Sequence, residues 1–187
     1  MASPASRITI LKPEELDDAQ RSVHDAIASG PRGVVRGPAL LWLHSPEYAA
    51  RIQSVGAYLR YDTVFDARLS ELAILVTARH YTCHYIWYQH SRIAREIGLS
   101  EDLINAIRDR KTPAFEHRDE TAVYQFTSEM LETNRVGDAT LAEIKALFGD
   151  RGAIELGAII GHYHLGAITL ATAELELPDG TTTLLPE

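Results

Sequence analysis

The stretch Asp66-Ala-Arg-Leu-Ser-Glu-Leu-Ala-Ile-Leu-Val-Thr-Ala-Arg-His80 decides the fold of this 187-residue chain. Asp66 is a favoured residue at a helix N-cap, and no glycine or proline interrupts the residues that follow it. The run Leu72-Ala-Ile-Leu-Val76 is apolar on nearly every side of a helix, which is typical of a helix buried on all sides. We therefore predict a central helix over Ala67–His80.

The next residues, Tyr81-Thr-Cys-His-Tyr-Ile-Trp-Tyr-Gln-His90, predict a second helix directly after the first. Thr82 can cap it, and Gly98 follows its expected end at Ile97. At about 100° per residue, Cys83, Trp87 and His90 share one face of this helix. Cys83 falls in its first turn, where free N–H groups and the helix dipole favour a thiolate. His90 lies about 10 Å further along the axis, so we expect both side chains to open onto one solvent-connected chamber.

Helical spacing and cap residues recur on both sides of this pair, and almost nothing has the pattern of a strand. The chain is therefore predicted to be all-α, with one domain over 38–187 and an N-terminal helix-and-loop arm over 1–37. A loop is expected over 31–37, a short apolar segment over 38–44 and an extended tail over 177–186. The other expected helices cover 13–30, 46–61, 101–110, 116–134, 139–148 and 150–174.

The overall composition excludes several classes of partner. The net charge of −8, without a basic stripe, disfavours binding to nucleic acid or to anionic membranes. The apolar stretch near Ile154–Thr172 contains His162, His164 and Glu155, so it predicts a core helix and no membrane span. The N-terminus lacks the layout of a signal peptide, and a single cysteine fits a reducing compartment. We therefore expect a cytoplasmic protein.

The order of the polar residues resembles a known family. Glu71 is followed after twelve residues by Cys83 and after seven more by His90. This order, its continuation to Ser100 and the later segment Glu155–Leu165 resemble the carboxymuconolactone decarboxylase and alkylhydroperoxidase-D-like family, from about residue 38 to the C-terminus. The family's redox members carry a second cysteine three positions after the first, where this chain has Ile86. The resemblance implies an all-helical fold, assembly as a trimer or hexamer, and either peroxide reduction by a cysteine pair or acid–base chemistry without one.

The single thiol favours acid–base chemistry, because a resolving cysteine normally regenerates an oxidised one. On the positions matched to the family, His90 is our candidate general base and acid. Glu71 would orient it, and Cys83 would donate a proton or bond the substrate. The candidate substrate-binding residues are Trp87, Tyr85 and His84. The predicted activity is lyase- or decarboxylase-type chemistry, without cofactor or metal, on a small carboxylated or lactone-like molecule.

Two alternatives stay open. One is a one-cysteine alkylhydroperoxidase, with peroxiredoxin-like activity that depends on an external thiol. The other is a non-catalytic oligomer that binds a ligand, in which the same side chains only pack or cap helices. The histidines His80, His162 and His164 could join the site, although His162 and His164 point about 200° apart on a helix, so at most one faces a shared pocket. Arg79 and Arg92 are candidate carboxylate anchors, for which a solvated surface position is the more common role.

Overall fold

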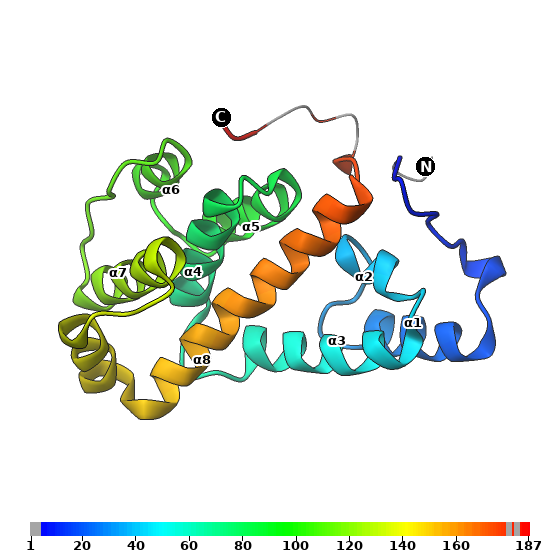
Figure 1. The fold of residues 1–187 in the computed structure, drawn as a ribbon, viewed down its shortest axis with the longest axis horizontal. Coiled ribbons are helices and arrows are strands. Elements are labelled where there is room, and N and C mark those ends of the chain that lie inside the picture. Colours follow the sequence, from blue (N-terminus) through cyan, green and yellow to red (C-terminus); the bar gives the residue numbers. More distant parts are fainter. Residues whose placement is uncertain (1–4, 179–180, 182–183) are drawn as a thin grey trace.

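The computed structural model describes residues 5–178, 181 and 184–187, and this part of the chain contains helices and no strand. The predicted all-α class is therefore confirmed. A short 3-10 turn, Pro13–Glu15, precedes eight α-helices (Figure 1). The helices are α1 (Asp18–Ser29), α2 (Pro38–Trp42), α3 (Pro46–Tyr61), α4 (Ala67–His80), α5 (His84–Glu96), α6 (Glu101–Arg108), α7 (Arg118–Thr133) and α8 (Asp138–Ala173).

Helix α4 occupies the centre of the bundle, as its sequence predicts. The Asp66 side chain caps it by accepting a 2.9 Å hydrogen bond from the backbone N–H of Leu69. Every residue from Leu69 to Arg79 is buried, because α4 packs against α5, α7 and α8. Such burial on all sides fixes the direction in which each polar side chain of α4 points.

Helix α8 crosses the whole molecule and packs against α3, α4, α5 and α7 (Figure 1). Gly149 separates two helical segments of it with φ 70° and ψ −177°, so the predicted break between the helices over 139–148 and 150–174 is confirmed. By length and composition α8 is the one helix in the described ranges that could cross a membrane. It is also the helix around which the bundle is built, which agrees with the prediction of a core helix.

The N-terminal arm begins differently from its prediction. The chain makes a 3-10 turn at Pro13 and starts α1 only at Asp18, because the Asp17 side chain caps the N–H of Gln20 at 2.8 Å. The arm packs around a second apolar cluster, formed by Leu16, Val23, Ile27, Ala39, Trp42, Leu43 and Ala49. This cluster takes residues from both sides of position 37, and the domain boundary there stays a prediction.

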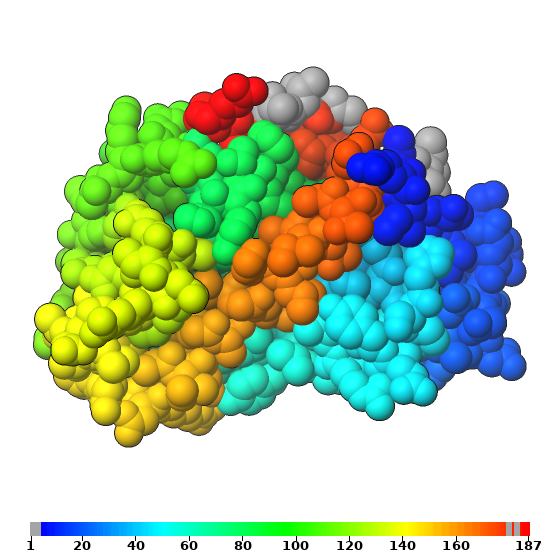
Figure 2. Space-filling view, viewed as in Figure 1, coloured from blue at the N-terminus to red at the C-terminus, as the bar shows by residue number. Residues whose placement is uncertain are grey.

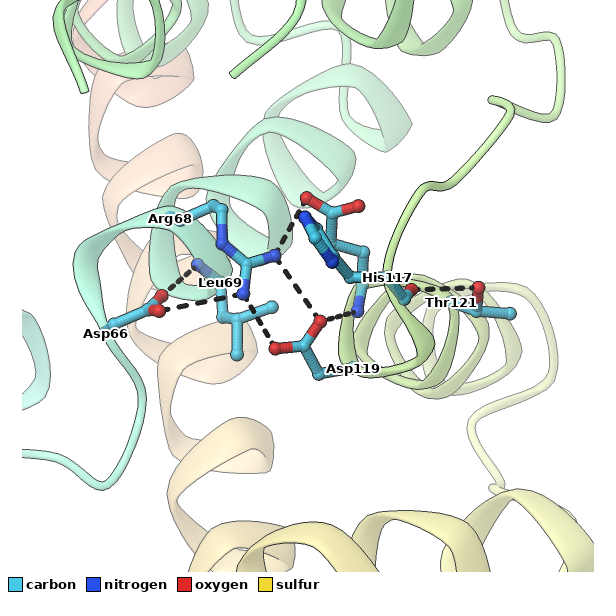
Figure 3. A network of polar contacts seen from close by, with 7 residues as sticks. Asp66, Arg68, Leu69, His117, Asp119 and Thr121 are labelled. Atoms are coloured by element: carbon cyan, nitrogen blue, oxygen red, sulfur yellow. Dashed lines mark hydrogen bonds and ion pairs between the residues drawn. The ribbon is translucent and has the colours of Figure 1, made fainter. Parts of the chain in front are cut away.

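An ion-pair network joins the N-terminal ends of α4 and α7 (Figure 3). The Arg68 guanidinium lies 2.6 Å from an Asp119 carboxylate oxygen, 2.8 Å from one of Glu120 and 3.6 Å from one of Asp66. The hydrogen bond from Arg68 holds the pKa of Asp119 below its ordinary value. Because three carboxylates share one half-buried cation, this network fixes the position of α7 beside α4.

Residues 184–187 lie against α4 and α5 (Figure 2). The Arg79 guanidinium donates a 2.8 Å hydrogen bond to the carbonyl oxygen of Pro186, and His84 Nδ1 accepts from the N–H of Leu184 at 3.3 Å. Leu185 is 4% exposed. The predicted surface position of Arg79 is therefore wrong: it is 3% exposed and anchors the chain's own tail.

Candidate functional site

Glu71 of α4 and His90 of α5 form a buried pair. His90 Nδ1 lies 2.7 Å from Glu71 Oε2, and both side chains are less than a tenth exposed. An ionised carboxylate can only accept, so Nδ1 carries the hydrogen and Nε2 is left as the basic nitrogen. The edge of the Tyr163 ring packs against the imidazole at 4.9 Å between centroids. The geometry thus gives Glu71 the orienting contact that the sequence predicts.

His90 lines a cavity of about 80 Å³ to which five parts of the chain contribute. The loop between α1 and α2 brings Arg32 and Arg36, and α3 brings Arg60. Ligand pockets for drug-sized molecules measure about 300–1,000 Å³, so this cavity fits only a compact molecule. The remaining side chains in the wall include His162 and Tyr163 of α8 and the apolar groups of Trp42, Tyr85 and Ile86.

The cavity has an excess of positive charge. Three arginines face it, whereas its nearest carboxylate, Glu71, lies behind His90 with one oxygen 4.0 Å from Arg60 Nη2. Burial lowers the pKa of His162 to about 4, with Arg32 and His90 adding to the shift. Burial also raises the pKa of the Tyr163 phenol, and the charge of Glu71 adds to this shift. At neutral pH both groups are therefore uncharged, and the arginines determine the field.

Cys83 lines a different cavity, of about 320 Å³, together with His84, Tyr81 and His164. The expectation that Cys83 and His90 share one chamber is therefore wrong. Cys83 is the N-cap of α5, with φ −82° and ψ 91°, so the 100° helical step that would align it with His90 does not start at this residue. Tyr85 contributes to the walls of both cavities and lies between them.

The expected thiolate character of Cys83 is also not found. Burial raises the pKa of the thiol, and the backbone N–H groups of Tyr85 and Ile86 only partly oppose this shift. The positive end of α5 is therefore outweighed by the loss of water around the sulfur. At neutral pH the thiol is protonated.

The other predicted candidates are divided between these cavities. Trp87 is 3% exposed, belongs to the core and lines neither cavity. His84 lines the cysteine cavity, where its Nδ1 is occupied by the C-terminal tail. His162 faces the arginine cavity and His164 the cysteine cavity, stacked on Tyr81 at 3.9 Å. The prediction that His162 and His164 cannot share a pocket is confirmed. His80 lines neither cavity.

Sequence patterns did not reveal the three cavity arginines or Tyr163. Arg32 and Arg36 lie in the predicted loop over 31–37, and the only sign of their role is that two arginines alternate there with glycines. Arg60 lies in the last turn of α3, and its sequence context predicts a side chain that points to solvent. Their convergence depends on tertiary packing, which no local pattern encodes.

Comparisons with known proteins agree with this fold. Residues 46–128 match the model of the carboxymuconolactone decarboxylase family, and no curated protein matches the chain. A structure described as an alkylhydroperoxidase AhpD core, an uncharacterised peroxidase-related protein from Ralstonia eutropha, superposes with a TM-score of 0.76 at 20% identity and covers 95% of both chains. A peroxidase-related protein from a Silicibacter species gives 0.75 at 14% identity over 94% of both chains. The debrominase Bmp8 gives 0.73 at 16% identity over 92% of both chains.

Proposed function

We propose that this chain, whose residues 46–128 match the model of the carboxymuconolactone decarboxylase family, is an acid–base enzyme that acts on a compact carboxylated or lactone-like molecule. The observation that carries the proposal is the Glu71–His90 pair, which opens into a cavity lined by arginines. In this pair Glu71 holds Nδ1 of His90, so Nε2 can act as a base. The arginines beside it would stabilise a negatively charged intermediate, and this combination suits reactions that pass through an enolate. No cofactor is part of the proposal.

The proposed chemistry follows from the free Nε2 of His90. In a decarboxylation, the bond between the carboxylate carbon and the ring breaks, and its electron pair moves into the conjugated carbonyl to give an enolate and carbon dioxide. His90, which has taken up a proton from solvent at Nε2, then delivers it to the carbon, and Glu71 stabilises the imidazolium while it exists. The positive charge that the arginines give to the same cavity would stabilise the enolate. In a proton shift the same nitrogen removes the proton and returns it.

The test is turnover of carboxymuconolactone in deuterated buffer, followed by proton NMR. This reports loss of substrate and also deuterium uptake at carbon, so proton transfer is detected even without decarboxylation. We expect His90→Gln to lower the rate about a hundredfold or more, and Glu71→Gln to lower it by a smaller factor. Cys83→Ser is the matched control and should retain wild-type turnover. Unchanged turnover in His90→Gln would refute the assignment.

A second candidate function is reduction of hydroperoxides at Cys83. The observation that favours it is the cavity of about 320 Å³ that this thiol lines. A structure of the debrominase Bmp8 in complex with 2,3,4-tribromopyrrole carries alanine in place of one of its cysteines. In the proposed reaction the thiolate attacks the peroxide, which leaves as an alcohol, and the resulting sulfenic acid is reduced by two external thiols with release of water. Peroxide consumption with added dithiothreitol that is lost in Cys83→Ser would establish it.

We also propose a location and an assembly. The protein would lie in the cytoplasm as a soluble trimer or hexamer, with a small-molecule substrate and no nucleic-acid or membrane partner. The acidic net charge and the family's fold support this placement. A non-catalytic ligand-binding role would be indicated if compact carboxylates bind but neither assay shows turnover.

A further inference from the structure

Arg32 is half-buried in the cavity wall without a counter-ion. Its Nε is inaccessible to solvent and has no hydrogen-bond partner in the part of the chain that the structure describes. No carboxylate among those residues lies within ion-pair distance of its guanidinium, and burial lowers the pKa of Arg32, as do the charges of Arg60 and Arg36. A guanidinium withdrawn from water and placed near two other cations is costly unless an anion completes its surroundings.

His162 provides a second unpaired polar atom at the same place. Its Nδ1 is buried and has no hydrogen-bond partner within the described ranges. Gly56 of α3 leaves room for both side chains: a Cβ at this position would lie 2.3 Å from Arg32 Nη2 and 2.6 Å from His162 Nε2. Arg32 and His162 therefore meet over one glycine, and each carries a buried nitrogen without a hydrogen-bond partner in the described part of the chain.

We infer that Arg32, Arg60 and His162 form a carboxylate subsite, which holds the anionic group of the substrate while its reacting carbon lies at Nε2 of His90. The inference rests on the proposed function for the reaction and adds the group that is recognised, a carboxylate on a compact molecule. Arginine presents a planar fork that matches the two oxygens of a carboxylate. The uncharged His162 imidazole adds a hydrogen bond without adding charge. The flat side chains of Trp42 and Tyr85 in the same wall would contact the ring or double bond that carries the carboxylate.

Two of the three residues of this subsite lie outside residues 46–128, the segment that matches the family model. Arg32 precedes residues 46–128 and His162 follows them, whereas Glu71 and His90 lie within them. The reacting pair thus comes from the shared part of the fold, and the group that selects the substrate comes from the N-terminal arm and α8 of this chain. Arg36 is exposed at the rim, where it would attract anions toward the cavity.

Isothermal titration of the full-length protein with 2-furoate, a flat five-membered ring that carries one carboxylate, tests the subsite. The uncharged amide of the same shape, 2-furamide, and inorganic phosphate are the comparison ligands. We expect furoate to bind at least about tenfold more tightly than furamide or phosphate, and Arg32→Gln to weaken furoate at least about tenfold. Arg51→Gln, on the exposed side of α3, is the control and should leave furoate affinity unchanged.

Gly56→Ala provides a second test that does not remove a charge. Alanine favours the helix more than glycine does, so α3 should persist while the new methyl group displaces Arg32 and His162, and furoate affinity should fall. The inference is overturned if furoate does not bind, if Arg32→Gln binds it as wild type does, or if phosphate binds more tightly than furoate. Furoate undergoes no reaction here, so failure of the subsite is measured separately from failure of the acid–base activity, which the deuterium experiment reports.

Discussion

The protonation of His162 links the cavity to the stability of the protein. Its folded pKa is about 4, below the ordinary value near 6.5 for an unfolded chain. Between these two values the unfolded state binds a proton that the folded state does not bind. The stability contributed by neutral His162 is therefore complete above about pH 6.5, and it is lost as the pH falls through that window towards 4. The positive charge of Arg32 also opposes protonation of His162, because a second cation beside it is unfavourable.

We predict that the free energy of unfolding in urea falls between about pH 7 and pH 4.5, and that His162→Gln removes about 1–3 kcal/mol of this fall. The remaining decrease includes the contributions of His80 and His84, whose pKa values burial also lowers. Equal pH dependence in His162→Gln and wild type would show that His162 does not titrate as described.

The residues of the site differ in how far the sequence could predict them. The pairing of Glu71 with His90 was predicted from the positions that match the family, and the structure shows the two side chains in contact. The sequence did not reveal that Cys83 and His90 line different cavities, because this depends on whether Cys83 lies inside the first turn of α5 or is its N-cap. Arg32 was also not accessible, because its partners come from α3 and α8, more than twenty residues away in the sequence. The family resemblance therefore identified the Glu71–His90 pair, whereas the arginines that give the cavity its positive charge were missed.

The kink of α8 at Gly149 depends on a backbone conformation that only glycine adopts easily. With φ 70° and ψ −177°, this residue lies in a region where a side chain is strained. We predict that Gly149→Ala lowers the free energy of unfolding by about 1–3 kcal/mol. Gly157→Ala, in the same helix with open space around its Cα, should instead be neutral or raise it by up to about 1 kcal/mol. Urea denaturation of both variants measures this, and equal effects would contradict a special role for Gly149.

Helix positions were predicted better than helix ends. The bounds of α3 and α4 agree with the prediction because proline or a capping aspartate marks each start. The start of α5 was wrong by one residue, because Thr82 adopts φ 47° and makes no cap. That single residue decides which cavity receives the thiol. A small error at one helix end therefore changed the predicted chemistry more than it changed the predicted fold.

The surface of the whole chain leaves several apolar side chains uncovered. Ile154 is 75% exposed, Ile168 54% and Val55 48%, and Val55 and Ile154 lie beside one surface hollow between α3 and α8. Leu185, near the C-terminus, is already buried by its own chain. The prediction of a trimer or hexamer therefore rests on the exposed apolar residues of the α3–α8 face and on the family resemblance.

Light scattering of the purified protein should give the mass of a trimer or a hexamer. Ile154→Asp, which places a charge at the most exposed of these apolar positions, should reduce the mass by dissociating the assembly. A monomeric wild type at working concentration would contradict the predicted oligomer. An assembly unaffected by Ile154→Asp would show that another face carries the contact.

The central claim is that substrates react beside the Glu71–His90 pair in the arginine cavity and do not react at Cys83. A crystal structure of the wild-type protein soaked with 2-furoate tests this most directly. We predict density for the carboxylate against the Arg32 guanidinium, with the furan ring next to Nε2 of His90. Density in the cavity that Cys83 and His164 line, with the arginine cavity empty, would contradict the claim.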